Sequence, residues 1–439
     1  MSSDWPLIKL SELCLKITDG AHQSPKSVTT GKPMASVKDL TRFGVDISNA
    51  RLISEEDFNV LIKQGCKPEV GDVLIAKDGN SALDTVCSVD AELDAVLLSS
   101  VAILRPDKSK VLTSYLKYYL SSADVIDYLK SNFISGAAIP RVVLKDFKKA
   151  DIRVPPLPEQ ETIASVLEAL DSRIKVLRET NATLEAIAQA LFKSWFVDFD
   201  PVRAKAEGLE PQAMDAPTAA LFPDSFEESQ LGLVPKGWRV GVLSDCCERV
   251  ESGGTPKRTA PEYWGGEVPW LTSGEVRKPI VLNTKEKITE LGVNQSSAKI
   301  WPQGTTVVAM YGATAGEVCL LANPSTANQA CCGLIPRVYS RAFTFICARR
   351  ERAALASKSS GSAQQNLNKG LVSNHPVLLP PKEVLSVFED VAGAALDGWI
   401  ASEQQTQTLT QLRDTLLPRL ISGQLRLPDA EQAVEEALA

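Results

Sequence analysis

The segment from Pro155 to Phe199 repeats apolar residues every 3.5 positions, and this regularity restricts the possible folds more than any other feature. Alternate steps of four and three residues lead from Ile163 to Trp195 and meet one strongly polar residue, Asn181. Such a pattern is typical of a coiled-coil seam, and prolines before and after it mark its ends. We therefore predict one helix over 155–199, about 60 Å long, in which Asn181 fixes the register with a partner helix. A long surface helix packed on a globular core is the alternative.

An internal repeat predicts the partner helix. At an offset of 225 residues, Ile163 falls on Phe388 and Leu184 falls on Leu409. A second helix is thus predicted over 380–426, and its seam is poorer because Ser402, Thr406 and Arg413 occupy matching positions. We expect the two helices to pair with each other. The predicted seam residues are Leu167, Leu170, Ile174, Leu177, Asn181, Leu184, Leu191, Trp399, Leu409 and Leu416.

The repeat continues into the segments before each helix. At an offset of 233 residues, Trp5 matches Trp238, and residues 71–76 match residues 304–309. Short β-like runs, such as 96–104, alternate here with turns, and 113–130 has a helical pattern, so each segment is predicted to be an α+β domain. The predicted order is a first domain at 1–154, a helix at 155–199, a connector at 200–236, a second domain at 237–379, a helix at 380–426 and a C-terminal tail at 427–439.

Composition and charge narrow the class of protein. The chain is 44% hydrophobic with a net charge of −7, it lacks a long apolar run, and its N-terminus lacks the pattern of a signal peptide. A soluble cytoplasmic protein without membrane contact is expected. The charge is uneven: residues 232–380 carry 17 basic and 10 acidic side chains, a net of +7. Because phosphate contact requires only a local positive potential, the second domain is a credible nucleic-acid site and the first is undecided.

Motifs for catalysis are absent from the sequence. Neither GxxxxGK[ST] nor GxGxxG occurs, and the glycine-rich run at 312–316 is better explained as a turn between strands. The nine cysteines form no CxxC pair and are accompanied by only two histidines, which favours buried free thiols over a metal site. We expect no active site, no metal and no cofactor in this chain.

Several stretches resemble the specificity subunit of type I restriction-modification systems, and the resemblance covers nearly the whole chain. The most specific are PPLPEQETIASVLEALDSRI at 155–174, FKSWFVDFDPVRAKAEG at 192–208, GLVPKGW at 232–238, GGTPKRTAPEYWGGEVPW at 253–270 and LRDTLLPRLISGQLRL at 412–427. The second helix departs from the family pattern, because PPLPEQ becomes PPKEVL at 380–385. Arg141 in the first domain also matches Asn366 in the second, so the two loops should not read the same bases.

The resemblance implies two target-recognition domains on two antiparallel helices, with each domain reading half of an asymmetric, interrupted site in double-stranded DNA. It also implies modification subunits that dock on the helices and methylate with S-adenosylmethionine, and restriction subunits that cut. Residue type and loop context select the candidate DNA contacts, which are His22, Lys26, Lys77, Arg141, Lys257, Arg258, Gln364, Gln365, Asn366 and Lys369. Each such loop has an alternative reading as an ordinary solvated loop. The alternatives for the whole chain are a tandem protein-binding scaffold that has lost DNA reading and an enzyme with an unrecognised site.

Overall fold

A computed structural model describes residues 5–135, 140–230, 232–358, 366–425 and 427–438. The chain divides into two compact units: the first contains Met1–Val176 and Gln407–Ala439, and the second contains Leu177–Thr406. Both long helices cross this division, so each unit contains a stretch of each helix. None of the helices in the described ranges combines the length and apolarity needed to cross a membrane.

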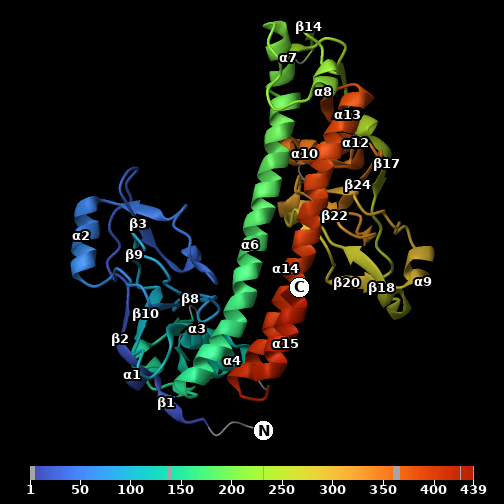
Figure 1. Cartoon of the computed structure of the whole chain (residues 1–439). Helices are drawn as coiled ribbons and strands as arrows, with labels where there is room; N and C mark the ends of the chain where they lie inside the picture. The colour runs from blue at the N-terminus through green and yellow to red at the C-terminus, as the bar shows by residue number, and fades with distance from the viewer. Residues whose placement is uncertain (1–4, 136–139, 231, 359–365, 426, 439) are drawn as a thin grey trace. The chain divides into compact units, whose positions relative to one another are not determined.

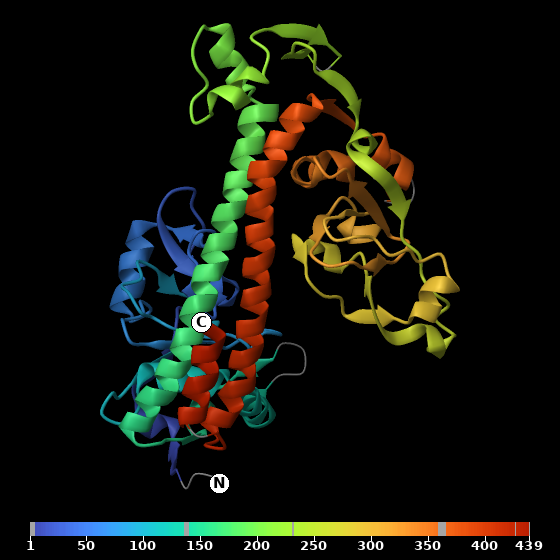
Figure 2. The same cartoon turned by 45° about the vertical axis from the view of Figure 1, so that its right-hand side comes forward.

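The first long helix, α6, runs over Leu157–Phe196 without a break. The second begins with α13 (Lys382–Phe388), passes through a π-helical turn η6 (Glu389–Gly393) and continues as α14 (Ala394–Ile421). Asp171 contacts Arg413 in the first unit, and Asn181 contacts Glu403 in the second. Later residues of α6 thus meet earlier residues of α14, and Figures 1 and 2 show the two helices side by side. The predicted antiparallel helix pair is confirmed.

Most of the predicted seam residues are buried. Eight of the residues are buried: Leu167, Leu170, Ile174, Leu177, Asn181, Trp399, Leu409 and Leu416. Leu184 and Leu191 are half-buried, and the neighbour of Leu191, Phe192, is the buried residue in that turn. The Asn181 side-chain amide donates to Glu403 Oε2 over 3.0 Å. Such a directional bond in an apolar seam favours one register over its neighbours.

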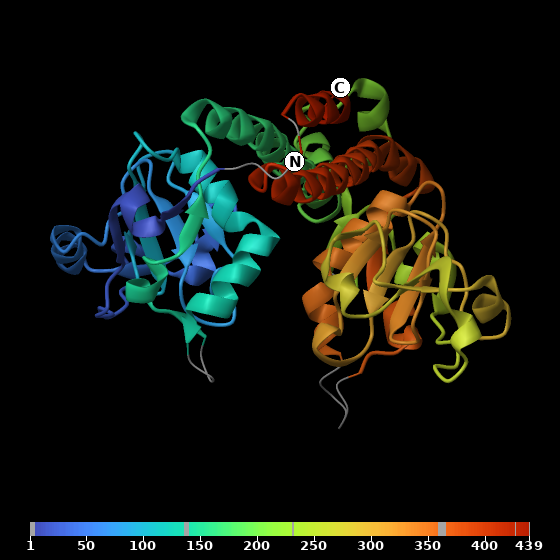
Figure 3. The ribbon, with the colours of Figure 1, turned by 90° about the horizontal axis from the view of Figure 1, so that it is seen from below.

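The first unit contains a four-stranded antiparallel sheet, a three-stranded sheet and several short helices. The four-stranded sheet has the order β2 (Cys14–Asp19), β10 (Val101–Pro106), β7 (Val73–Ala76) and β8 (Val86–Ser88). The three-stranded sheet has the order β6 (Arg51–Ile53), β3 (Lys32–Ala35) and β9 (Val96–Leu97), and β1 (Leu7–Lys9) pairs with β13 (Asp151–Arg153). Two further pairs are β4 (Leu40–Thr41) with β5 (Gly44–Val45) and β11 (Ile134–Ser135) with β12 (Arg141–Val142). The helices are α1 (Leu10–Leu13), α2 (Glu55–Lys63), α3 (Thr113–Ser121), α4 (Ala123–Phe133) and α5 (Leu144–Phe147), with α3 against β7 and β8 (Figure 3).

The second unit restates this plan, with one additional strand in its larger sheet. Its larger sheet has the order β17 (Cys247–Ser252), β24 (Cys331–Pro336), β21 (Thr306–Ala309), β22 (Val318–Leu321) and β19 (Ile280–Val281). Its smaller sheet has the order β20 (Glu286–Ile288), β18 (Trp264–Leu271) and β23 (Thr326–Ala327), and β16 (Arg239–Val242) pairs with β25 (Pro376–Leu379). The helices after the connector are α9 (Glu290–Asn294), α10 (Arg341–Arg350), α11 (Arg352–Ser357) and α12 (Lys369–Ser373).

Matching glycines show how closely the two copies agree. Gly20 follows β2 and Gly253 follows β17, at the predicted offset of 233 residues. A Cβ at Gly20 would lie 2.1 Å from the Leu97 carbonyl oxygen, and one at Gly253 would lie 2.2 Å from the Asn328 carbonyl oxygen. Because both contacts are with backbone atoms, any side chain would push the neighbouring segment away. The mixed α and β architecture and the two-copy plan are confirmed.

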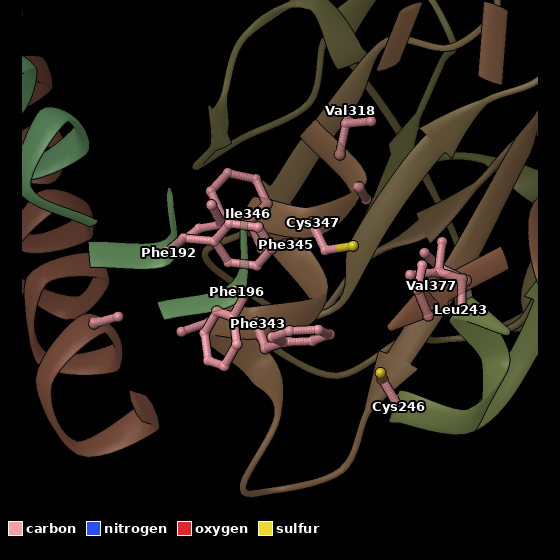
Figure 4. Packing of buried hydrophobic residues seen from close by; sticks show 14 of the residues in the cluster. Phe192, Phe196, Leu243, Cys246, Val318, Phe343, Phe345, Ile346, Cys347 and Val377 are labelled. Carbon is pink, nitrogen blue, oxygen red and sulfur yellow. The ribbon is translucent and has the colours of Figure 1, made fainter. Parts of the chain in front are cut away.

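The remaining segments are short elements and one terminal helix. Residues 200–236 form α7 (Asp200–Ala206), α8 (Ala216–Ala220), β14 (Phe226–Ser229) and β15 (Gly232–Pro235). The segment expected as a C-terminal tail forms α15 (Leu427–Leu438), which buries Ala430 and Val434. All nine cysteines are free thiols, and eight of them are buried. Figure 4 shows Phe192 and Phe196 of α6 beside Phe343 and Phe345 of α10 in the apolar core of the second unit.

Candidate nucleic-acid interface

In the first unit, three predicted contact residues gather where β2 and β7 end. Lys77 follows β7, and its Nζ lies 2.6 Å from Oδ2 of Asp19, the last residue of β2. The other carboxylate oxygen of Asp19 lies 3.1 Å from His22 Nε2. The His22 side chain is 75% exposed, whereas that of Lys77 is 8% exposed. One carboxylate thus orients an exposed imidazole and a buried ammonium.

Arg141 lies at the same end of the sheet, although it comes from β12. Its backbone forms an isolated antiparallel bridge with Asp78, and its Nε donates to Asp78 Oδ1 over 3.1 Å. The Val142 amide donates to the Lys77 carbonyl, which brings β12 to the end of β7. The Arg141 side chain is 62% exposed and is available to a ligand. Lys26 lies exposed in the loop between β2 and β3.

Burial separates Lys77 from the other candidates of the first unit. A phosphate would have to break the ion pair with Asp19 to reach its ammonium, and that would leave a buried carboxylate without its cation. Lys77 is therefore placed to hold the ends of β2 and β7 together. Its selection rested on residue type and loop context, which do not report burial. Among the described candidates of this unit, His22, Lys26 and Arg141 present their side chains to solvent.

In the second unit, two tryptophans organise the loop that carries Lys257 and Arg258. The Arg258 guanidinium lies 3.8 Å from the ring centroid of Trp264 and 4.8 Å from that of Trp270. It also forms an ion pair and hydrogen bonds with Glu286, and the hydrogen bonding holds the pKa of the Glu286 carboxyl below its ordinary value. The Trp264 indole donates to the Lys257 carbonyl over 3.1 Å, and the Trp270 indole donates to the Gly254 carbonyl over 3.0 Å. The loop is pinned at both ends, and both cationic side chains remain exposed.

Asn366 occupies the position in the second unit that Arg141 occupies in the first. It forms an isolated antiparallel bridge with Tyr311, the residue that the offset of 233 matches to Asp78. The Leu367 amide donates to the Met310 carbonyl over 2.7 Å, as the Val142 amide donates to the Lys77 carbonyl. Lys369 begins α12 and is exposed. Gln364 and Gln365 lie outside the described residues.

The loop that carries Lys257 and Arg258 reaches the end of the larger sheet at which Tyr311 and Asn366 lie. Thr255 forms a side-chain hydrogen bond with Gln329, and the next residue, Ala330, accepts from the Met310 amide over 2.7 Å. Thr255, Gln329, Tyr311 and Asn366 therefore border one end of the larger sheet. The sequence-based selection missed Asp19, Asp78, Trp264, Gln329 and Tyr311. The repeat could have indicated Asp78 and Tyr311, since they fall on matching positions just after β7 and β21.

These groups are suited to hydrogen bonding and ion pairing. His22 pairs with Asp19, and His375 is buried between Glu351 and Lys358, so both imidazoles contact ionisable groups rather than the hydroxyl or thiol of a nucleophile. Within the described ranges, no three His, Cys, Asp or Glu side chains are placed to hold a metal ion. Exposed cationic, amide and aromatic groups at one sheet end are the donors and stacking surfaces that nucleic-acid contacts use.

Comparison with known proteins agrees with this chemistry. The model of the type I restriction modification DNA specificity domain matches residues 2–186 and 235–392. The HindI specificity subunit, a type I restriction enzyme subunit of Haemophilus influenzae, is 29% identical over 382 residues, which is 77% of this chain and 83% of that protein. The MjaIX specificity subunit of Methanocaldococcus jannaschii is 24% identical over 326 residues, which is 73% of this chain and 71% of that protein.

A solved structure shares the fold over nearly the whole chain. The crystal structure of the S subunit of a type I restriction-modification system from M. genitalium covers 95% of this chain, and 96% of that structure is matched, with a TM-score of 0.62 at 14% identity. At this identity the likeness supports the fold alone. The family model covers both copies of the internal repeat. The chain therefore belongs to the type I restriction-modification DNA specificity family.

Proposed function

We propose that this chain is the DNA-recognition subunit of a type I restriction-modification complex, in which each globular segment reads one half of an asymmetric, interrupted site. The first recognition segment is residues 1–154, and the second recognition segment is residues 237–379. The difference between the matching backbone bridges supports this most directly: one joins Asp78 to Arg141, and the other joins Tyr311 to Asn366. The same scaffold position carries different side chains in the two copies, as two readers of different sequences require.

The chemistry of these side chains fits base reading in the major groove. Arginine can donate two parallel hydrogen bonds to guanine O6 and N7, and asparagine pairs with adenine N6 and N7. Arg141 and Asn366 would thus favour different bases at equivalent places of the two half-sites. The exposed lysines Lys26, Lys257 and Lys369 would contact phosphates, which give affinity and register without reading sequence. Lys77 would act by holding Asp19 in place.

The partners follow from the same proposal. Modification subunits that bind S-adenosylmethionine would dock on α6 and α14, and restriction subunits would join that complex to cut the DNA. The chain itself would supply recognition and no catalysis, and the complex would work in the cytoplasm. Its DNA affinity should depend strongly on salt, because each phosphate that a cation neutralises releases bound counterions.

An exchange of segments tests the proposal. Residues 237–370 are replaced by the matching region of another family member with a known site, and methylated sequences are mapped for the assembled complex. We expect one half of the recognised sequence to change and the other half to persist, and an exchange of residues 1–154 should change the opposite half. Alteration of both halves by either exchange would contradict separate readers. Assembly without sequence-specific methylation would favour a scaffold that has lost DNA reading.

A further inference from the structure

Helix α10 connects the second recognition segment to both long helices, and all the contacts lie within the second unit. Phe343 lies 5.4 Å from Phe192 of α6 between ring centroids and 5.0 Å from Phe196 (Figure 4). Phe345 lies 6.4 Å from Trp399 of α14. These apolar contacts stabilise the attachment, but they are not directional and would tolerate a small slide or rotation.

Arg341, the first residue of α10, forms directional hydrogen bonds with the second long helix. Its Nη1 and Nη2 donate to the two carboxylate oxygens of Asp397 over 2.6 and 3.0 Å, and its Nε donates to Glu389 Oε1 over 2.9 Å. Nη2 also donates to the Gly393 carbonyl over 3.0 Å. The guanidinium therefore binds three residues of one helix in a planar geometry that no other side chain can copy. The second Glu389 oxygen accepts from the Ala342 amide over 2.6 Å, which fixes the start of α10 itself.

The hydrogen bonds of Arg341 lie at the π-helical turn η6, which contains Glu389 and Gly393. A Cβ at Gly393 would lie 2.5 Å from Glu389 Oε1 and 3.1 Å from Arg341 Nη2, so glycine leaves room for the guanidinium and its acceptor. Single π-helical turns interrupt α-helices mostly where function requires a local change of geometry. Here the turn brings Glu389, Gly393 and Asp397 to one arginine.

A second arginine on α10 binds the first helix. Arg349 forms an ion pair with Glu185 of α6, and its guanidinium lies 5.6 Å from the Phe345 ring and 5.9 Å from the Trp399 ring. The side chains of Arg341 and Arg349 are 20% and 22% exposed. Because partly desolvated charge-assisted hydrogen bonds are stronger and more directional than exposed ones, the two arginines fix α10 against one helix each.

The first recognition segment lacks this device at the matching place. Gly71 and Gly304 correspond in the repeat, and the chain beside Gly71 carries Thr113, whose hydroxyl donates to the Gly71 carbonyl over 2.9 Å. The Cβ that a substitution would add at Gly304 lies 2.9 Å from Arg341 Cδ. Thr113 begins α3, which packs on β7 and β8, and Arg341 begins α10, which packs on the matching strands β21 and β22. The two helices are therefore equivalent, and a threonine that bonds its own segment stands where the arginine reaches the long helix.

We infer that Arg341, supported by Arg349, is a positioning residue that sets the number of base pairs between the two half-sites. The inference rests on the proposed function, because a bipartite site is read only if both segments meet their half-sites on one duplex. A change of one base pair shifts a half-site by about 3.4 Å and about one tenth of a turn. A rigid attachment of α10 to the long helices would prevent binding to a site with the altered spacing. A purely apolar attachment would allow α10 to slide and accommodate it.

The test measures methylation by the assembled complex on duplexes with the mapped spacer and with one base pair more or fewer. In Arg341→Met, the rate on altered spacers relative to the mapped spacer should rise about tenfold, which corresponds to about 1.4 kcal/mol. The half-site sequences should stay the same. Arg341→Lys should behave similarly, because an ammonium cannot reproduce the planar clamp. Arg239→Met is the matched control, since Arg239 forms an exposed ion pair with Asp245 in the same unit.

Asp397→Asn provides an independent reading, because it keeps the side-chain shape, removes one charge and should shift the ratio in the same direction. An unchanged ratio in both Asp397→Asn and the double variant Arg341→Met/Arg349→Met would overturn the inference. Absence of a bipartite site for the complex that contains the unsubstituted chain would instead contradict the proposed function. The failure of the inference and the failure of the proposed function are therefore distinct.

Discussion

Removing the Asp171 carboxylate should destabilise the first unit severely. Asp171 of α6 is buried, with a side chain 7% exposed, and its Oδ1 accepts from Arg413 Nη1 of α14 over 2.8 Å. Its Oδ2 accepts from the Tyr118 hydroxyl of α3 over 3.0 Å, and Arg42 approaches Oδ1 to 3.5 Å. One carboxylate therefore joins both long helices to the first recognition segment.

The size of the effect follows from what remains after the substitution. In Asp171→Ala, the buried Arg413 keeps Asp414 as a partner, but Arg42 and Tyr118 lose the carboxylate between them. Breaking a buried ion pair on one side costs about 3–5 kcal/mol, and the lost tyrosine hydrogen bond adds about 0.5–1.5 kcal/mol. The exposed pair Lys9–Asp151 in the same unit is the control, and Lys9→Met should cost at most about 1 kcal/mol.

Guanidinium titrations followed by circular dichroism measure the free energy of unfolding of the transition that includes this unit. Asp171→Ala and Arg413→Met should each lower it by several kcal/mol, and the double variant Asp171→Leu/Arg413→Met should recover only part of the loss, because Arg42 and Tyr118 still lack the carboxylate. Losses below about 1 kcal/mol for both single variants would refute the reasoning.

Three further outcomes are expected. The fragment 1–200 should self-associate, and the substitution Ala188→Arg should strengthen this association. Ala188 occupies in α6 the repeat position of Arg413, so an arginine there would face Asp171 of the other copy. Light scattering that shows monomers for both the fragment and its Ala188→Arg variant would contradict this. Burial raises the pKa of the Cys87 and Cys332 thiols to about 12, so at pH 8 these thiols should react with a labelling reagent far more slowly in the native chain than in the unfolded chain. Because only the unfolded chain then ionises these thiols, the free energy of unfolding should decline as pH rises from 9 toward 12. Rapid labelling of all nine cysteines in the native chain would contradict this. Trp264→Ala should weaken DNA binding by the complex about tenfold, as a cation–π contact of about 0.5–2 kcal/mol is lost, while Lys287→Met, which removes an exposed ion pair on the neighbouring strand, should not; equal affinities in fluorescence anisotropy would count against this role of Arg258.

The helix pair could be predicted from the sequence because its signals are local and repeated. Prolines before residue 159 and the 3.5-residue spacing predicted a helix at 155–199, and α6 spans Leu157–Phe196. The duplicated plan was evident from the offsets alone. Breaks within elements were less accessible: 113–130 divides into α3 and α4 at Ser122, and 96–104 divides into β9 and β10. Each break depends on how the neighbouring segments pack.

Polar residues were harder to place, because their roles depend on partners distant in the sequence. Arg413 reads as a defect in a seam pattern, yet its partner Asp171 lies 242 residues away and makes it a specific contact between helices. Lys77 reads as a loop cation, yet Asp19 buries it in an ion pair. Trp264 lies in one of the stretches that carry the family resemblance, yet only the fold shows its contact with Arg258. A pattern of residue types shows where polar groups lie in the chain, whereas their partners emerge only from the fold.

Mapping methylated bases in the host genome with and without this gene tests the central claim most directly. With the gene and its partner subunits present, we expect one asymmetric motif of two half-sites separated by a fixed number of unread base pairs, and we expect that methylation to vanish when the gene is removed. Identical methylation in both strains, or a gene-dependent motif that is one continuous sequence, would contradict the account.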